Sequence, residues 1–247
     1  MLKRVLQGIA NRLGYHVGRN PPENSLGRDL QSLLQRKDIN CVVDVGAHRG
    51  EYGSLLRTLG YVARIISFEP VPESFAALAA LAQADSNWSV QAVALGRETG
   101  TLPIKVMVGS TFSSFRVPSE FARARFGTKV DVVRQVDVRV EQLENVLDAC
   151  GSTAGESTHI FLKCDTQGHD LEVVRGAGNA IGRVLGLQVE LPLKAVYDGL
   201  PSFTESFDEL RALGFEVVGI YPVTRDDCDN VIVCGQAVWN SLAYITR

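Results

Sequence analysis

Apolar residues along the chain alternate between short continuous runs and longer stretches with helical spacing. The continuous runs predict strands over residues 41–45, 64–69, 88–94, 159–164, 184–190, 215–221 and 230–235. The stretches with helical spacing predict helices over residues 25–36, 51–59, 73–84, 168–176 and 203–213. Because strands and helices alternate, the pattern predicts a doubly wound, Rossmann-like α/β fold with helices on both faces of a mainly parallel sheet.

The connection between the last two predicted strands differs from the others. Residues 215–221 and 230–235 are joined by a short polar loop, which leaves no room for a helical crossover. We therefore expect these two strands to pair antiparallel and to end the sheet as a terminal hairpin.

Residues 96–158 interrupt the alternation. They contain a hairpin-like segment, GTLPIKVMV, then the polar stretch STFSSF, an arginine-rich segment and a helix near residues 141–149. Because they lie between the third and fourth predicted strands, they are placed near the strand ends at which α/β proteins bind ligands. We interpret them as an acceptor-side insertion in a single domain of residues 38–247, and the hydroxyls and rings of STFSSF suit one face of a sugar.

Residues 1–37 form an N-terminal region of amphipathic and lead-in helices. In MLKRVLQGIANRLGYHVGR the apolar residues recur at helical spacing with basic residues between them, and no uninterrupted apolar core marks a secretory signal. The pattern favours a helix that packs on the domain or mediates self-association with a second copy. A second interpretation is a basic helix that lies peripherally on an anionic membrane surface.

Composition narrows the class of protein. Of the 247 residues, 45% are hydrophobic and 21% are charged, as is usual in globular proteins. The net charge of −3 gives no bulk attraction to nucleic acid, and we expect no nucleic-acid partner. The five cysteines form no CxxC pair, so we expect a cytoplasmic protein without structural zinc.

The first predicted strand ends in a glycine-containing turn, DVGAHRG, at residues 44–50. Its spacing is D-x-G-x-x-x-G, whereas a dinucleotide fingerprint needs G-x-G-x-x-G so that a pyrophosphate can approach the backbone. Asp44 would repel a diphosphate, although an acid there can also cap the turn. A carboxylate at this place suits a cofactor that carries an amino group and no phosphate, such as S-adenosylmethionine.

The second predicted strand ends in SFEP, with Glu69 at its carboxyl end. A carboxylate there accepts two hydrogen bonds from a ribose diol, as in nicotinamide-dependent enzymes. The turn and this acid together therefore predict a nucleoside cofactor. We expect cofactor contacts from Asp44, Gly46, Ala47, His48, Gly50, Tyr52, Glu69, Pro70 and Val93.

Several longer segments resemble the FkbM-type family of S-adenosylmethionine-dependent methyltransferases. They are VVDVGAHRGEY, ISFEPVPESF, AVALG, FLKCDTQGHDLEVVRGA, QVEL, SFDELRALGFEVV and DNVIVCG, and they run from about residue 40 to residue 235. The segment FLKCDTQGHDLEVVRGA is the most specific. The resemblance implies a class I methyltransferase sheet of seven strands and, usually, O-methylation of a hydroxyl on a sugar, glycan or natural product. One departure is His48, where the family most often has a small polar residue such as asparagine.

Methyl transfer to a hydroxyl benefits from a positioned base, by roughly 10²–10⁴-fold. Asp165 ends the fourth predicted strand, where it would contact the acceptor or the cofactor, or cap the next helix. His169 begins that helix, whose dipole would lower the pKa of the imidazole and keep it neutral. Lys163 shares a face with Asp165, and its role as a catalytic group or as the ion-pair partner of Asp165 or Glu190 is open. The catalytic candidates are therefore Asp165, His169 and Lys163.

Asp165 and Glu190 end neighbouring predicted strands, as do the acids that hold Mg²⁺ in catechol-type methyltransferases. Those enzymes place another polar ligand directly after the fifth strand, whereas Leu191 and Pro192 follow Glu190 here. We therefore expect no metal at this site.

The leading prediction is an O-methyltransferase that takes a small-molecule or glycan acceptor. The alternatives are N-methylation of a small-molecule amine, a nicotinamide-dependent oxidoreductase, and a cofactor-binding module without catalysis. The missing middle glycine and Asp44 argue against the oxidoreductase. The sequence does not identify the acceptor atom, so both methylation reactions stay open.

Overall fold

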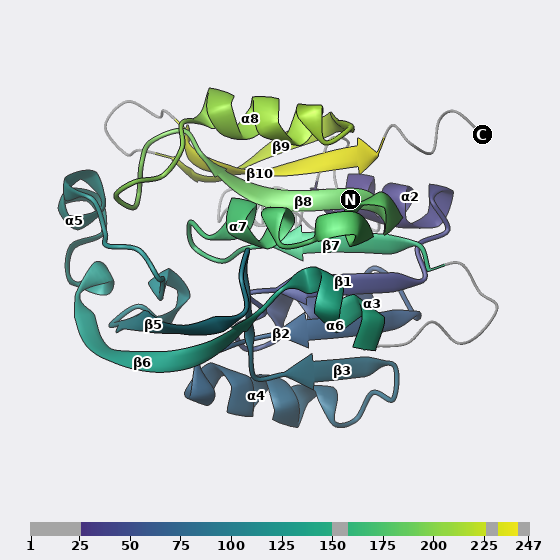
Figure 1. The fold of residues 1–247 in the computed structure, drawn as a ribbon, viewed down its shortest axis with the longest axis horizontal. Helices are drawn as coiled ribbons and strands as arrows, with labels where there is room; N and C mark the ends of the chain where they lie inside the picture. Colours follow the sequence, from purple (N-terminus) through teal and green to yellow (C-terminus); the bar gives the residue numbers. More distant parts are fainter. Residues whose placement is uncertain (1–25, 150–157, 226–231, 242–247) are drawn as a thin grey trace, which may run out of the picture.

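The structure is a computed structural model that describes residues 26–149, 158–225 and 232–241. Its main sheet has seven strands in the order β3-β2-β1-β7-β8-β10-β9 (Figure 1). These strands are β1 (Cys41–Val45), β2 (Arg64–Phe68), β3 (Trp88–Gln91), β7 (Ile160–Cys164), β8 (Val184–Pro192), β9 (Phe215–Arg225) and β10 (Ile232–Ser241). Neighbours pair parallel except at β10, which runs antiparallel to β8 and β9. The predicted fold class and terminal hairpin are confirmed.

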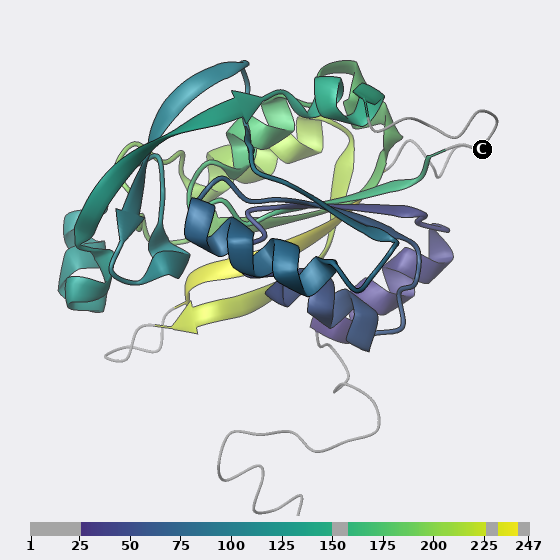
Figure 2. The same ribbon diagram turned by 90° about the horizontal axis from the view of Figure 1, so that it is seen from below.

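Helices cover both faces of the main sheet (Figure 2). One layer consists of α2 (Leu26–Arg36), α3 (Glu51–Thr58) and α4 (Pro72–Ala82), and the other of α6 (Leu143–Ala149), α7 (Asp170–Arg175), the 3₁₀ turn η3 (Gly178–Arg183) and α8 (Phe203–Ala212). Val42 belongs to the core cluster of Leu56 in the first layer, and Val43 to that of Leu210 in the second. Successive side chains of a strand point to opposite faces, which is why β1, buried along its whole length, contributes to both layers.

Several predicted elements have different boundaries in the structure. The last two strands are longer than predicted, since β9 ends at Arg225 and β10 at Ser241. The predicted strand 88–94 divides, because β3 ends at Gln91 and the next pair of residues forms β4 (Ala94–Leu95) of another sheet. The predicted helix 168–176 begins only at Asp170. Gln167 and Gly168 precede it with φ of 53° and 90°, and residues with left-handed backbone cannot belong to an α-helix.

The segment between β4 and β7 builds a second sheet of three strands in the order β4-β6-β5. β5 (Gly100–Met107) pairs antiparallel with β6 (Val132–Glu141), so the hairpin-like segment expected at 100–108 is a single strand with a distant partner. The connection holds η1 (Ser110–Phe112), α5 (Glu120–Phe126) and η2 (Gly127–Val130). This segment lies beside the carboxyl ends of the central strands (Figure 1). Its contact with an acceptor stays a prediction.

The N-terminal region is described only from α2 onward. Leu30, Leu33 and Leu34 are buried and fix α2 on the sheet. The amphipathic helix expected before it lies outside the described residues, so its contact with a second copy or a membrane stays a prediction. Within the described ranges, no helix combines the length and apolar character needed to cross a membrane.

A buried ion pair crosses the centre of the main sheet. Asp44 of β1 and Lys163 of β7 are neighbours in register, with 3.0 Å between Oδ1 and Nζ, and both side chains are buried. Burial alone would lower the pKa of Lys163, but the charge of Asp44, its hydrogen bond to Lys163 and the charge of Asp165 together raise the pKa above its ordinary value. Ser67 donates to the other Asp44 oxygen at 3.0 Å, and the Trp88 indole donates to Ser67 at 2.9 Å. The polar chain therefore joins four adjacent strands.

Lys163→Met should lower the free energy of unfolding by about 3–5 kcal/mol, because it leaves the Asp44 carboxylate buried without a counter-charge. Urea denaturation checks this value. The control is Arg134→Met, which breaks the exposed Arg134–Glu73 pair (2.6 Å) and should cost less than about 1 kcal/mol. The double variant Asp44→Asn/Lys163→Met should recover part of the loss, and equal losses in Lys163→Met and the control would contradict the assignment.

Candidate active site

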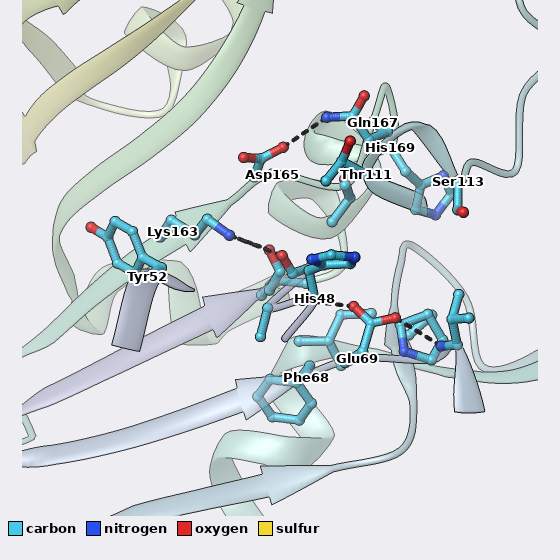
Figure 3. A pocket seen from close by; sticks show the side chains of 18 of the residues that line it. His48, Tyr52, Phe68, Glu69, Thr111, Ser113, Lys163, Asp165, Gln167 and His169 are labelled. Carbon is cyan, nitrogen blue, oxygen red and sulfur yellow. Dashed lines mark hydrogen bonds between the residues drawn. The ribbon is translucent and has the colours of Figure 1, made fainter. Parts of the chain in front are cut away.

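A cavity of about 440 Å³, here the first cavity, lies at the carboxyl ends of β1, β2 and β7 (Figure 3). Its wall combines the glycine-containing turn, the segment after β2, β4, residues from β5 to Phe115 and the segment after β7. Among the predicted site residues, the wall contains Gly46, Ala47, His48, Tyr52, Glu69, Pro70, Lys163, Asp165 and His169. Leu26 and Gln188 also line it, and neither was predicted from the sequence because each comes from a distant element.

Three predicted cofactor contacts are not part of the wall. Asp44 is fully buried with Lys163 beneath the turn, so its charge is neutralised inside the sheet instead of facing a cationic ligand. Val93 packs in the core on the side of α7. A Cβ at Gly50 would lie 2.7 Å from the side chain of Leu81 of α4, so this glycine serves helix packing. All three residues thus contribute to the packing around the first cavity and do not line it.

Gly46 brings the turn into contact with the segment after β7. Its φ is 74°, and a Cβ there would lie 2.0 Å from the carbonyl oxygen of Asp165. Only glycine tolerates both the left-handed backbone and this close approach. The floor of the first cavity and the segment that carries Asp165 are therefore packed directly on each other.

Glu69 presents a buried carboxyl group to the first cavity (Figure 3). Its two oxygens accept hydrogen bonds from the backbone N–H of His48 at 2.9 Å and of Val71 at 2.8 Å. Burial raises the pKa of Glu69 to about 7, although both hydrogen bonds oppose the shift. Each carboxylate oxygen has lone pairs left for a ligand, so Glu69 can accept from a ribose diol.

His48 links the turn to the second sheet. Its backbone has φ of 48°, and its ring lies with Nδ1 3.1 Å from Glu51 and Nε2 2.9 Å from the hydroxyl of Ser110. Ser110 opens the STFSSF stretch, in which Thr111, Ser113 and Phe115 also line the first cavity. The stretch therefore covers the cavity.

Lys163 is held in place by the ion pair and by the turn. Besides Asp44, its ammonium contacts the carbonyl oxygens of Gly46 at 3.0 Å and Val45 at 3.3 Å. The expected partners, Asp165 and Glu190, are not its ion-pair partners; Asp44 is, because the parallel register places it directly opposite. With its pKa raised, Lys163 stays charged near neutral pH and cannot serve as a base.

Tyr52 forms the edge of the same wall. Its hydroxyl donates to Gln188 at 2.9 Å, and its ring lies 5.3 Å from the Lys163 ammonium. Burial raises the pKa of Tyr52, with a further contribution from Asp44. Tyr52 therefore remains a neutral hydroxyl that can bind polar groups of a ligand.

Gln167 bridges the two acids at the ends of β7 and β8 (Figure 3 shows the first contact). Its Nε2 donates to Asp165 at 3.0 Å and to Glu190 at 3.1 Å, and its Oε1 accepts from the Tyr197 hydroxyl at 2.8 Å. The Ser114 hydroxyl donates to the Gln167 carbonyl at 2.6 Å. The sequence analysis missed Gln167, although a glutamine directly before a glycine that ends a strand-to-helix turn was a usable signal.

The carboxylate that holds the segment before α7 in place belongs to Asp170, not to Asp165. This carboxylate accepts from the backbone N–H of Thr166 at 2.7 Å and of Glu190 at 2.9 Å. Asp165 is therefore left to face the cavity instead of capping the helix. In the part of the chain that the structure describes, no group of three His, Cys, Asp or Glu side chains is arranged to hold a metal.

His169 lines the first cavity beside Phe115, with ring centroids 4.8 Å apart. Its pKa is lowered to about 4, in the predicted direction, but the cause is burial and then the charge of Arg116, opposed by Glu172. Its Nε2 is buried without a hydrogen-bond partner among the described residues. The imidazole is therefore neutral near pH 7 and can accept a hydrogen bond.

A second cavity of about 290 Å³ adjoins the first. Thr111, Asp165 and Gln167 line both. The rest of its wall comes from Phe112, Phe126, Gly168, Glu190, Pro192, Val196, Tyr197, Leu200, Val223, Thr224 and Cys234. The sequence analysis found only Asp165, Glu190 and the STFSSF stretch among these, because the others come from segments that meet only in the folded chain.

Comparison with known proteins gives several matches. Solved structures that align with this chain include an rRNA methylase from Streptococcus thermophilus (10% identity, 92% of this chain and 99% of that one, TM-score 0.45). Another is a magnesium protoporphyrin IX methyltransferase from Synechocystis PCC 6803 with bound SAM (10% identity, 87% and 77%, TM-score 0.44). Curated proteins give no significant match. The family model described as "Methyltransferase FkbM domain" matches residues 44–217, and the chain therefore belongs to the FkbM methyltransferase family.

Proposed function

We propose that the protein transfers a methyl group from S-adenosylmethionine to a hydroxyl group on a sugar, glycan or natural-product acceptor. The observation that carries this proposal is the position of Asp165, which lines both cavities where they meet. A base at that junction can reach an acceptor on one side while the methyl donor lies on the other. Membership in the FkbM family supports methyl transfer.

The residues of the first cavity fit S-adenosylmethionine. Glu69 would accept hydrogen bonds from the ribose hydroxyls, and the turn from Gly46 to His48 would hold the methionine end. The apolar side chains of Val71 and Leu95 would contact the adenine. When bound, the cofactor supplies a methyl carbon attached to a positively charged sulfur.

Asp165 would take the proton of the acceptor hydroxyl. Bound S-adenosylmethionine would supply the methyl group to the acceptor oxygen, and the carboxylate of Asp165 would receive the proton that this oxygen loses. Gln167 holds one Asp165 oxygen at 3.0 Å and so fixes the orientation of the group. His169 is the weaker candidate, because it lines the first cavity only and does not reach the junction of the two cavities.

We further propose that the reaction needs no Mg²⁺. The Nε2 group of Gln167 donates one hydrogen bond to Asp165 and another to Glu190. An amide N–H group is a donor and does not bind cations, so the donor set suits hydrogen bonding to an acceptor better than metal coordination.

Asp165→Asn should lower kcat by about 10²–10⁴-fold, because an amide cannot take the acceptor proton. The dissociation constant for S-adenosylhomocysteine should change less than about threefold, because Asp165 acts on the acceptor. Release of S-adenosylhomocysteine with a panel of neutral methyl glycosides measures kcat, and calorimetric titration measures binding. In the control His169→Gln, kcat should stay within about tenfold of wild type. A larger fall in His169→Gln than in Asp165→Asn would assign the base to His169.

S-adenosylhomocysteine should bind less tightly as the pH falls through the raised pKa of Glu69, about 7. The ionised form accepts both ribose hydrogen bonds, and protonation removes one of these acceptors. The ionised fraction falls about tenfold between pH 8 and pH 6, so the dissociation constant should rise by up to about tenfold. Glu69→Gln should bind weakly at both pH values without this dependence. If calorimetry showed that the wild type binds S-adenosylhomocysteine with the same dissociation constant at both pH values, the ribose contact would be refuted.

A further inference from the structure

The second cavity has a composition that membership in the methyltransferase family does not specify. Most of its wall is formed by η1 and α5, which connect β5 to β6, by the segment after β8, and by the ends of β9 and β10. We propose that this cavity is the acceptor site and that it selects an uncharged, ring-shaped acceptor bearing hydroxyl groups, while it rejects anionic acceptors such as uronic acids and sugar phosphates. The inference rests on the proposed methyl transfer to a hydroxyl.

One part of the wall is apolar and aromatic. The rings of Phe112 and Phe126 lie with centroids 4.9 Å apart at an angle of 46°, and Val196 and Leu200 belong to the same cluster. Each of these rings offers an apolar face of the kind that packs against the C–H face of a sugar or another saturated ring. This surface favours a ring-shaped acceptor over a flexible chain.

The other end of the cavity is polar and lies at the junction with the first cavity. Burial and the nearby charge of Asp165 raise the pKa of Glu190, so Glu190 keeps its proton near neutral pH. The end therefore presents one carboxylate, one carboxylic acid and the Tyr197 hydroxyl, all tied to Gln167. Groups that both donate and accept hydrogen bonds in this way pair with hydroxyl groups.

No lysine, arginine or histidine is among the described residues that form the wall. Arg116 lies behind Gly168, where its guanidinium donates to the carbonyl oxygens of Gly168 at 2.6 Å and Gly199 at 2.8 Å. A carboxylate or phosphate bound in the cavity would thus face Asp165 without a cationic partner in this part of the wall. Like charges brought together across a desolvated interface are rejected, which gives the cavity its selectivity.

The same geometry argues against a cationic acceptor. An ammonium group beside Asp165 would form an ion pair with it and occupy the carboxylate oxygens that would otherwise accept from the acceptor hydroxyl. A carboxylate held in that way is a poorer base for the acceptor proton. An uncharged acceptor leaves Asp165 able to take the proton.

The test uses the full chain saturated with S-adenosylhomocysteine and a panel of methyl hexosides and methyl deoxyhexosides, with the matching methyl uronates and amino-sugar glycosides. Saturation-transfer NMR detects binding, and titration gives dissociation constants. We expect at least one neutral glycoside to bind in about the millimolar range and its uronate to bind about tenfold or more weakly. With S-adenosylmethionine in place of S-adenosylhomocysteine, the amino analogue should be methylated more slowly than the neutral glycoside.

Variants connect the result to this cavity. Phe126→Ala should weaken binding of the neutral glycoside about tenfold, whereas Phe121→Ala, a truncation on the same helix outside the wall, should change it less than about threefold. Asp165→Asn should narrow the difference between neutral glycoside and uronate to within about threefold, because it removes the repelling charge.

The outcomes separate this inference from the proposed function. If S-adenosylhomocysteine binds but no neutral glycoside does, or if the uronate binds as tightly as the neutral glycoside, the inference is wrong and the methyltransferase proposal stands. Faster methylation of the amino glycoside than of the neutral glycoside would also overturn it, in favour of an amine acceptor. Failure of S-adenosylhomocysteine itself to bind would instead refute the proposed cofactor.

Discussion

A charged pair buried between β1 and β7 ties the turn of the first cavity to the strand that carries the proposed base. Lys163 contacts Asp44 and, through two further contacts, the carbonyl oxygens at the start of the turn. Ser67 and Trp88 extend the polar chain across β2 and β3. Since a buried charge without its partner is strongly destabilising, the turn and the strand ends keep one relative position. Methyl transfer depends on such alignment of donor, methyl carbon and acceptor.

The second sheet and the segment that connects its strands form the remaining wall of the site. Ser110 contacts His48 of the turn, Ser114 donates to Gln167, and Arg116 donates to Gly168. Each contact joins the inserted segment to a loop at the carboxyl end of the main sheet. The wall around the proposed acceptor is therefore a composite of the core fold and the insertion, and the insertion supplies the aromatic part.

The sequence predicted the elements whose signals are local. Helix α8 begins after Ser202 in a capping box with Glu205, and β1 is buried along its whole length, so both stand where the pattern put them. The partner of β5 was missed because the 100–108 segment pairs with a strand that follows after the whole of α5. Pairing at such separation depends on the assembled sheet and leaves no local trace.

The same distinction applies to the site. Glu69 was recognised because a strand end and a glycine turn are both readable in the chain. Strand alternation placed Lys163 and Asp165 on one face, but the register that sets Asp44 opposite Lys163 is a property of two strands together. The second cavity was missed for a similar reason, since Phe126, Tyr197 and Thr224 meet only after folding.

The contact between Gly46 and the carbonyl of Asp165 restricts which loops of this enzyme can change in sequence. The cofactor loop and the base-bearing loop fill each other's space, so neither can be remodelled alone. Side chains such as Phe112 and Phe126 belong to the insertion, line the second cavity but not the first, and pack in a separate small cluster with Met107. Substitutions in the insertion can therefore change which acceptor is bound, while the loops that carry out methyl transfer stay the same.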